Sequence, residues 1–163
     1  PCLGYPEIAR QFSDGAPSLA SVRRAVLETR RSKSMLLDRS DENARSCGSF
    51  FLNPELSQSE LESLRARCPS APPSFALADG RSKVPAAWLI EQAGFRRGQR
   101  WGAVGISSRH SLALVCHAGS SSRALLEAAH RVRDGVANAF GVWLRPEPQF
   151  LGFGPITDGL PSL

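Results

Sequence analysis

The side chains best suited to chemistry gather in one short stretch, residues 48–54, with the sequence Gly-Ser-Phe-Phe-Leu-Asn-Pro. Along an extended backbone, Ser49 and Asn53 would point to one face, so a short strand could present a hydroxyl and a carboxamide together. Phe50 and Leu52 would then point to the other face. On the pattern alone, a buried core strand ended by the Asn-Pro pair is the favoured interpretation.

Three further polar residues are candidates for a site. Glu147 lies between two prolines, and because proline fixes φ, its carboxylate would be stiffly presented. Lys33 ends a predicted helix, where a cation complements the helix dipole, and His110 begins a predicted strand. A surface role is the alternative for each of them. Ser49 lacks the G-x-S-x-G frame of hydrolases, which disfavours that class of enzyme.

The composition suits one domain, or one domain and a piece of another. The chain has 163 residues, of which 42% are hydrophobic, so it can bury a real core. Its formal charge of +5 comes mostly from arginine, which suits phosphate-bearing ligands. The basic pairs are scattered and no recognition motif joins them, so no nucleic-acid partner is expected.

The four cysteines show neither C-x-x-C spacing nor clustering with histidines, so free, buried thiols are expected rather than zinc ligands. They are Cys2, Cys47, Cys68 and Cys116. No apolar run approaches the roughly 20 residues of a membrane span, so no membrane partner is expected. The chain begins at Pro1 without an initiator methionine, which suggests processing or truncation. A reducing cytoplasm is the expected location.

Helix starts and ends are the clearest structural signals. Ser57 and Glu60 have the spacing of a capping box, in which the hydroxyl accepts from the glutamate amide and the carboxylate reaches back. Gly94 and Gly141 are placed to end two other helices. Helices are therefore expected at residues 18–33, 57–68, 85–93 and 120–140, after an irregular segment, 1–15, with breakers at Pro6, Asp14 and Gly15.

Strands are expected at five places between the helices. They are residues 48–53, two short strands joined by a turn at 78–80, the apolar run 110–116, and 142–144 resuming at 150–151. Because helices and strands alternate unevenly and the connections are short, we predict an α+β domain. A small mixed or antiparallel sheet should pack with several helices.

Three motifs carry a resemblance to a known family. Gly48–Pro54, Lys83–Gly94 and Leu144–Gly152 resemble, in the same order, the carboxy-terminal region of UDP-N-acetylenolpyruvoylglucosamine reductase, also called UDP-N-acetylmuramate dehydrogenase. The resemblance implies that residues 34–152 are a substrate-binding domain. Residues 1–33 would be the end of a preceding domain, a linker and the first helix, and 153–163 a tail. The flavin-binding domain of the family would lie outside this chain.

The resemblance also implies an oxidoreductase of peptidoglycan precursor synthesis. In the family, NADPH reduces FAD, and the flavin passes hydride to UDP-N-acetylglucosamine enolpyruvate to give UDP-N-acetylmuramate. The serine that donates the proton matches Ser49, and the catalytic glutamate matches Glu147. Positions that contact the UDP-sugar match Lys33, Asn53 and His110. FAD would be held mainly by the protein's own amino-terminal flavin domain, so this chain alone should not turn over.

A stand-alone nucleotide-sugar binding module without redox activity is the alternative. Such a module would keep cations for the diphosphate. It would need neither a proton donor nor an acid, so the presence of Ser49 and Glu147 together favours the enzyme. A basic nucleic-acid binder comes third, and strongly salt-dependent binding to mixed oligonucleotides would distinguish it.

Overall fold

A computed structural model describes residues 3–12, 17–153, 156–157 and 159–161. The expected breakers Asp14 and Gly15, and Cys2, lie outside these residues. The helices are α1 (Pro6–Ala9), α2 (Leu19–Ser32), the short 3-10 helix η1 (Glu42–Ala44), α3 (Gln58–Arg67), α4 (Ala86–Gln92) and α5 (Ser122–Phe140). The strands are β1 (Glu55–Leu56), β2 (Phe75–Ala76), β3 (Ser82–Lys83), β4 (Arg100–Trp101), β5 (Val104–Ile106), β6 (Leu114–Cys116), β7 (Ile156–Thr157) and β8 (Leu160–Pro161).

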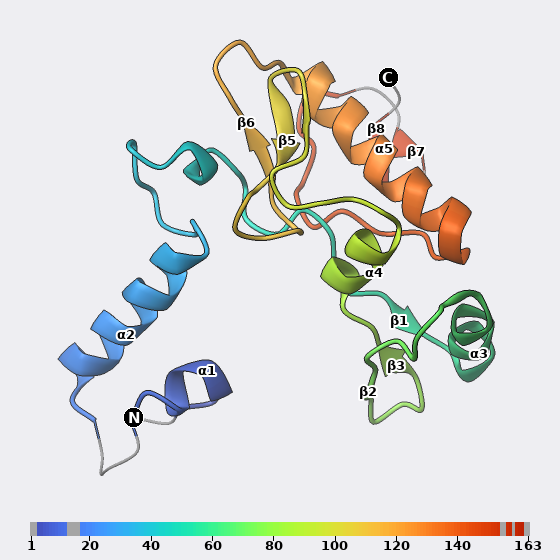
Figure 1. The fold of residues 1–163 in the computed structure, drawn as a ribbon, viewed down its shortest axis with the longest axis horizontal. Helices are drawn as coiled ribbons and strands as arrows, with labels where there is room; N and C mark the ends of the chain where they lie inside the picture. Colours follow the sequence, from blue (N-terminus) through green and yellow to red (C-terminus); the bar gives the residue numbers. More distant parts are fainter. Residues whose placement is uncertain (1–2, 13–16, 154–155, 158, 162–163) are drawn as a thin grey trace.

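The strands form small antiparallel sheets. One has the order β1-β3-β2, with Glu55 opposite Lys83, and the other has the order β4-β5-β6, with Val104 opposite Cys116. β7 and β8 pair with each other. In Figure 1, α5 runs alongside β5 and β6, whereas α3 lies beside the β1-β3-β2 sheet. The predicted α+β class is confirmed.

The predicted helix signals place the helices correctly. The Ser57 hydroxyl accepts from the Glu60 amide at 3.3 Å, and the Glu60 carboxylate accepts from the Ser57 amide at 2.7 Å, which completes the capping box. Gly141 ends α5 with φ of 72°, a left-handed conformation that glycine adopts without strain. Two short helices, η1 and α1, were not predicted. Pro6 starts the single turn of α1 inside the segment expected to be irregular.

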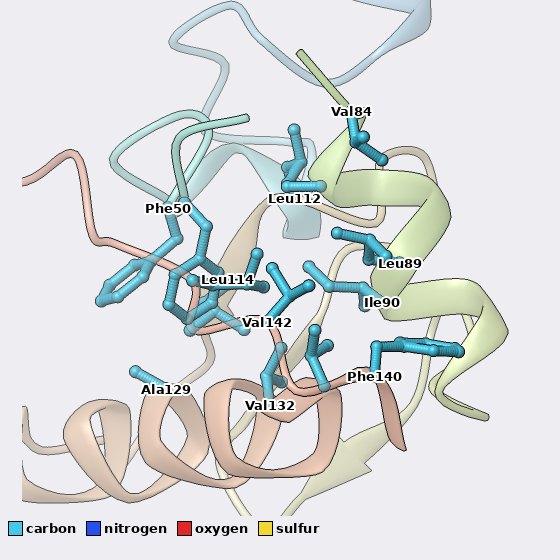
Figure 2. Close-up of a cluster of buried hydrophobic side chains, with 14 of the residues drawn as sticks. Phe50, Val84, Leu89, Ile90, Leu112, Leu114, Ala129, Val132, Phe140 and Val142 are labelled. Atoms are coloured by element: carbon cyan, nitrogen blue, oxygen red, sulfur yellow. The ribbon is translucent and has the colours of Figure 1, made fainter. Parts of the chain in front are cut away.

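The core lies between α5, α4 and the β4-β5-β6 sheet. Figure 2 shows Val132 and Phe140 of α5 facing Leu89 and Ile90 of α4, with Phe50 at the side of the cluster. Val132, Leu89 and Ile90 are each at most 1% exposed. The apolar residues of α5, which recur at spacings of three and four residues, therefore pack into the core.

Residues 48–54 are extended but differ from the expected strand. Phe50 and Phe51 are both buried, 1% and 2% exposed, whereas Leu52 is 44% exposed. The segment has neighbours on two sides. The Phe50 amide donates to the Leu112 carbonyl, and the Leu52 amide donates to the Arg145 carbonyl. Simple alternation fails because protein covers the segment on both faces.

The other expected strands are shorter in the structure. Only the end of the 110–116 run forms β6, because the Ala113 amide donates to the His110 carbonyl and closes a turn before it. Residues 142–144 are not a strand, and the only pairing described near them is an isolated bridge between Phe51 and Pro146.

The carboxy-terminal residues pack more closely than a tail would. Leu160 is fully buried in the core cluster, and the Pro161 carbonyl lies 2.9 Å from Nε2 of His130 on α5. This end of the described chain is therefore held against α5.

The amino-terminal helices lie apart from this core in Figure 1. α2 begins at Ser18, whose hydroxyl accepts from the Ser21 amide, and so confirms the predicted helix start. Its residue Leu19 is 77% exposed. Cys47 is also exposed, contrary to the expected burial of the thiols. Among the described helices, none combines the length and the apolar character needed to cross a bilayer.

Candidate active site

One large cleft brings together residues from distant parts of the chain. It has a volume of about 890 Å³ and lies between the 49–56 segment, α3 and the 140–147 segment. Ser49, Asn53 and Glu147 line it, whereas Lys33 and His110 do not. The structure therefore places three of the five predicted site residues in one cleft.

Backbone hydrogen bonds fix the two segments that carry Ser49 and Glu147. The Glu147 amide donates to the Phe50 carbonyl at 2.9 Å, and the Leu52 amide donates to the Arg145 carbonyl at 2.9 Å. These bonds run in an antiparallel pattern on either side of the Phe51–Pro146 bridge. The hydroxyl and the carboxylate are thus carried by paired backbone rather than by free loops.

The turn before Ser49 depends on Gly48. Its φ is 83°, a left-handed value at which a side chain would be strained. Ser49 itself is half-buried, and Glu147 is exposed. Within the described residues, no side chain or backbone group hydrogen-bonds the Ser49 hydroxyl or the Glu147 carboxylate. Both groups are therefore available to a ligand in the cleft.

The pKa of the Cys47 thiol is affected by its surroundings, which include Glu147. Although the residue as a whole is exposed, the protein atoms around the thiol raise its pKa by desolvation, and the charge of Glu147 raises it further. The thiol is consequently protonated at neutral pH.

Asn53 is held in a defined orientation by α4. Its Oδ1 accepts a hydrogen bond from the Ala86 amide at 2.9 Å, which satisfies an amide that the first turn of a helix leaves unpaired. The amide nitrogen of Asn53 is left with two donors. Asn53 can therefore donate to an acceptor, such as a phosphate oxygen, without losing its structural bond.

Lys33 and His110 lie outside the cleft but near each other. Lys33 follows α2, and its Nζ forms an ion pair with Glu7 at 2.5 Å. Burial first, and then the charges of Lys33 and Arg97, lower the pKa of His110. His110 Nδ1 accepts from the Leu112 amide at 3.2 Å. These contacts keep His110 neutral and connect it to the Leu112 wall of the cleft.

Several residues that line the cleft were not among the predicted site residues. They include Arg67 of α3, and Trp143 and Arg145 of the segment after α5. The sequence held a signal for Arg145, because it stands two residues before Glu147 and so shares a face with it on an extended backbone. It held none for Arg67, which reaches the cleft only through the packing of α3.

A second hollow of about 350 Å³ lies on another part of the surface. Arg39, Arg45 and Arg100 line it together with acids of the η1 region. Among the described residues, no group of three or more His, Cys, Asp or Glu side chains is arranged to hold a metal ion.

Comparison with known proteins identifies the relatives of this chain. The family model of the UDP-N-acetylenolpyruvoylglucosamine reductase C-terminal domain matches residues 40–151. The chain is similar to UDP-N-acetylenolpyruvoylglucosamine reductase of Thermobifida fusca (strain YX), with 46% identity over 160 residues, 92% of this chain and 45% of the relative. It is also similar to the protein of the same name from Salinispora arenicola (strain CNS-205), with 43% identity over 88% of this chain and 42% of the relative. The chain spans a little under half the length of the curated relatives it matches.

Proposed function

Because this chain belongs to the UDP-N-acetylenolpyruvoylglucosamine reductase family through the carboxy-terminal domain, we propose that it binds the UDP-sugar and protonates it during reduction. The relatives named as reductases of UDP-N-acetylenolpyruvoylglucosamine and the cleft containing Ser49 and Glu147 support this proposal. The product would be UDP-N-acetylmuramate, a peptidoglycan precursor made in the cytoplasm.

The reaction adds hydrogen across the enolpyruvyl double bond, one carbon taking a hydride and the other a proton. FAD, reduced by NADPH, supplies the hydride when it is bound by the protein's own amino-terminal flavin domain. The residues present fit this division of roles. Phe51 and Leu112 give the cleft buried apolar walls, whereas Ser49 and Glu147 remain accessible.

Ser49 donates the proton in this proposal. A hydroxyl is a weak acid, so it needs a fixed position and a neighbour that stabilises the oxyanion or returns the proton. Gly48 and the bonds of the Phe50 backbone supply the position. Because no protein group competes for the hydroxyl within the described residues, the O–H of Ser49 is free to donate to a ligand in the cleft.

Glu147 is the neighbour that the proposal requires. Its backbone is fixed between two prolines and by the hydrogen bond to Phe50. From this position it either holds the enolic intermediate or assists its protonation. The carbanionic centre next to the substrate carboxylate carries developing negative charge, so groups that donate hydrogen bonds must face it. Glu147 can serve there only as the carboxylic acid, which donates its proton to the intermediate or returns it to Ser49.

Lys33, Asn53 and His110 bind the UDP-sugar in this proposal. The free amide donors of Asn53 suit the oxygens of the diphosphate. Lys33 must exchange its Glu7 partner for the phosphate, which is feasible because a half-exposed ion pair is worth only about 0–1 kcal/mol.

The test separates the two halves of the reaction in the complete flavin-containing protein. Ser49→Ala should leave flavin reduction by NADPH unchanged and slow flavin reoxidation by the UDP-sugar by roughly 10²- to 10⁴-fold. Ser63→Ala is the matched control, because Ser63 lines the same cleft but its hydroxyl is bonded to the Ser59 carbonyl. Equal loss in both half-reactions would contradict the proton-donor role.

A second measurement decides between the enzyme and the binding module. The complete protein should oxidise NADPH in the presence of UDP-N-acetylglucosamine enolpyruvate, and this chain alone should not. Binding of the UDP-sugar without any flavin reoxidation would favour the binding module instead.

A further inference from the structure

A polar segment joins α2 to the core. Residues 34–47 follow Lys33 and lead to Ser49, and the short helix η1 lies within them. Figure 1 shows η1 between α2 and β6, and η1 packs against β6. The bonds that hold this segment therefore also determine how Lys33 lies relative to the core.

Asn43 of η1 is bonded to a turn that lies 64 residues further along the chain. Its Oδ1 accepts hydrogen bonds from the Ser108 amide at 2.9 Å and from the Ser107 hydroxyl at 3.1 Å, with the Ser108 hydroxyl further away at 3.3 Å. An amide oxygen has two lone pairs, so the two shorter bonds use its full capacity. Ser107 is 1% exposed, and water therefore cannot easily replace Asn43 as its partner.

Asp41 connects Asn43 to the end of α2. Its Oδ1 accepts from the Asn43 amide at 2.9 Å and so caps η1. A hydrogen bond from the Ser34 side chain is the largest of the effects that lower the pKa of Asp41. Ser34 directly follows Lys33 and is only 5% exposed. A continuous series of hydrogen-bonded residues thus runs from the neighbour of Lys33 to Ser107.

The other end of this series is the turn that carries His110. The Ser107 amide donates to the Ala113 carbonyl at 2.9 Å, and the Ser107 hydroxyl accepts from the Arg109 amide at 3.1 Å. The His110 carbonyl accepts from the Ala113 amide at 3.1 Å. These bonds close the turn on itself, so His110 is fixed relative to Ser107.

Ser49 is held by other bonds. The amide of the next residue, Phe50, donates to the Leu112 carbonyl at 2.8 Å, and the Phe50 carbonyl accepts from the Glu147 amide at 2.9 Å. Neither bond involves Asn43. Loss of the Asn43 carboxamide should therefore leave the proposed proton donor in place.

We propose that Asn43 is a positioning residue, whose carboxamide joins the segment after Lys33 to the turn that carries His110 and so sets the separation of these two residues. The inference rests on the proposed function, in which Lys33 and His110 both contact the UDP-sugar. A fixed separation lets both contacts form without prior ordering of the chain, which strengthens binding. Asn43 itself touches no substrate.

Steady-state kinetics of the complete flavin-containing protein tests this role. Asn43→Ala should raise KM for UDP-N-acetylglucosamine enolpyruvate roughly tenfold, the contribution of one hydrogen bond to a charged group, because Lys33 and His110 lose their alignment. Both kcat and flavin reduction by NADPH should stay nearly unchanged. Glu42→Gln is the control, since Glu42 belongs to the same helix and its side chain makes no hydrogen bond or ion pair within the described residues. A wild-type KM in Asn43→Ala, or a fall in kcat as large as the rise in KM, would overturn the positioning role.

A double-mutant cycle isolates the bond between Asn43 and Ser107. Ser107→Ala removes the hydroxyl donor and leaves the backbone bond to Ala113 in place. It should raise KM by a smaller factor than Asn43→Ala, because the Ser108 amide still donates to Asn43. Once Asn43 is alanine, adding Ser107→Ala should raise KM by less than Ser107→Ala does alone. Fully multiplicative effects would show that the two residues act separately and would refute the link.

The pKa of His110 gives a readout that does not need catalysis. Burial and the charges of Lys33 and Arg97 lower it, and the charge of Glu91 raises it. If Asn43 holds Lys33 in its place, Asn43→Ala should raise this pKa toward its ordinary value of 6.5 in an NMR titration. The same change should have little further effect in a Lys33→Gln background. An unchanged pKa, or an equal rise in both backgrounds, would contradict the proposal.

These tests distinguish failure of the positioning role from failure of the proposed function. A complete protein that does not reduce UDP-N-acetylglucosamine enolpyruvate, but in which Asn43→Ala still raises the pKa of His110, would refute the function and keep the link between Lys33 and His110. An active reductase whose Asn43→Ala variant keeps both the KM and the His110 pKa of the wild type would refute the positioning role alone.

Discussion

Helices α2 and α5 both carry apolar residues at helical spacing, but most of those in α5 are buried, whereas Ala25 is the one buried residue described in α2. In α5, Val132 and Val136 are at most 1% exposed. In α2, Leu19 is 77% exposed and Val26 is 36% exposed, although both lie on the apolar face of the helix. Periodicity therefore predicts the helix in both places, whereas burial depends on which other elements pack against it.

The candidate site residues likewise come from both a well-packed and a more exposed part of the chain. Ser49, Asn53 and Glu147 belong to the body, which we define as residues 48–151, while Lys33 follows α2 of the amino-terminal helix pair, residues 6–32. The body should hold its residues rigidly. The helix pair should hold Lys33 through local contacts such as the Glu7 ion pair.

The largest expected difference in stability is between replacing a buried leucine and replacing an exposed one. Leu89→Ala in α4 removes a fully buried side chain from the core and should lower the free energy of unfolding by about 2–5 kcal/mol. Leu19→Ala in α2 should change it by about 0.5 kcal/mol or less. Denaturant unfolding followed by circular dichroism measures both. A comparable loss in the two variants would mean that the apolar face of α2 is covered.

The next effect compares two helix caps of the same chemistry. Ser57→Ala removes the capping box of α3 and should cost about 1 kcal/mol of global stability. Ser18→Ala removes the cap of α2. In that variant, faster hydrogen exchange should stay within α2, because the helix pair can open without the body. A global loss from Ser18→Ala would show that the two regions unfold together.

His110 gives a pH dependence that joins the two regions. Its pKa is lowered in the folded protein, from an ordinary value of 6.5, by burial and then by the charges of Lys33 and Arg97. The unfolded chain binds the proton more readily, so this contribution to stability is fully present above about pH 6.5 and is lost as the pH falls toward the lowered pKa. Lys33→Gln should raise the pKa of His110 in an NMR titration. No change would mean that Lys33 and the helix pair do not lie against the body in solution.

The smallest expected effect is that of the ion pair within the helix pair. Lys33 and Glu7 have side chains that are 40% and 53% exposed. Glu7→Gln should therefore change the free energy of unfolding by no more than a few tenths of a kcal/mol. A loss above about 1 kcal/mol in the free energy of unfolding, measured by thermal unfolding, would show that this ion pair holds α1 and α2 together.

Local signals in the sequence predicted much of the fold. The capping box, the glycine after α5 and the turn between β2 and β3 each act within a few residues, so they can be read directly. The strand predictions were less accurate. Phe50 and Phe51 are both buried because residues 112 and 145–147 pack on two sides of them, and no local pattern contains those partners.

The same distinction applies to the candidate site. Motif resemblance pointed to Ser49, Asn53 and Glu147, and the structure places them in one cleft. Their catalytic and binding roles stay predictions, as do the domain boundaries. Arg67 could not be predicted to line the cleft, because it gets there through the packing of α3 and its approach to Gly141. Residues contributed by tertiary packing have no signature in their own sequence.

The hydrogen bonds between the Phe50–Leu52 and Arg145–Glu147 backbones have a consequence for how the protein is made. Ser49 and Glu147 are roughly a hundred residues apart in the chain, and contacts of such separation form slowly because a long loop must close first. On the ribosome, Arg145 and Glu147, which pair with Leu52 and Phe50, emerge roughly a hundred residues after Ser49. The cleft therefore cannot take its final shape until residue 147 has been synthesised, and before then the segment that carries Ser49 lacks this partner.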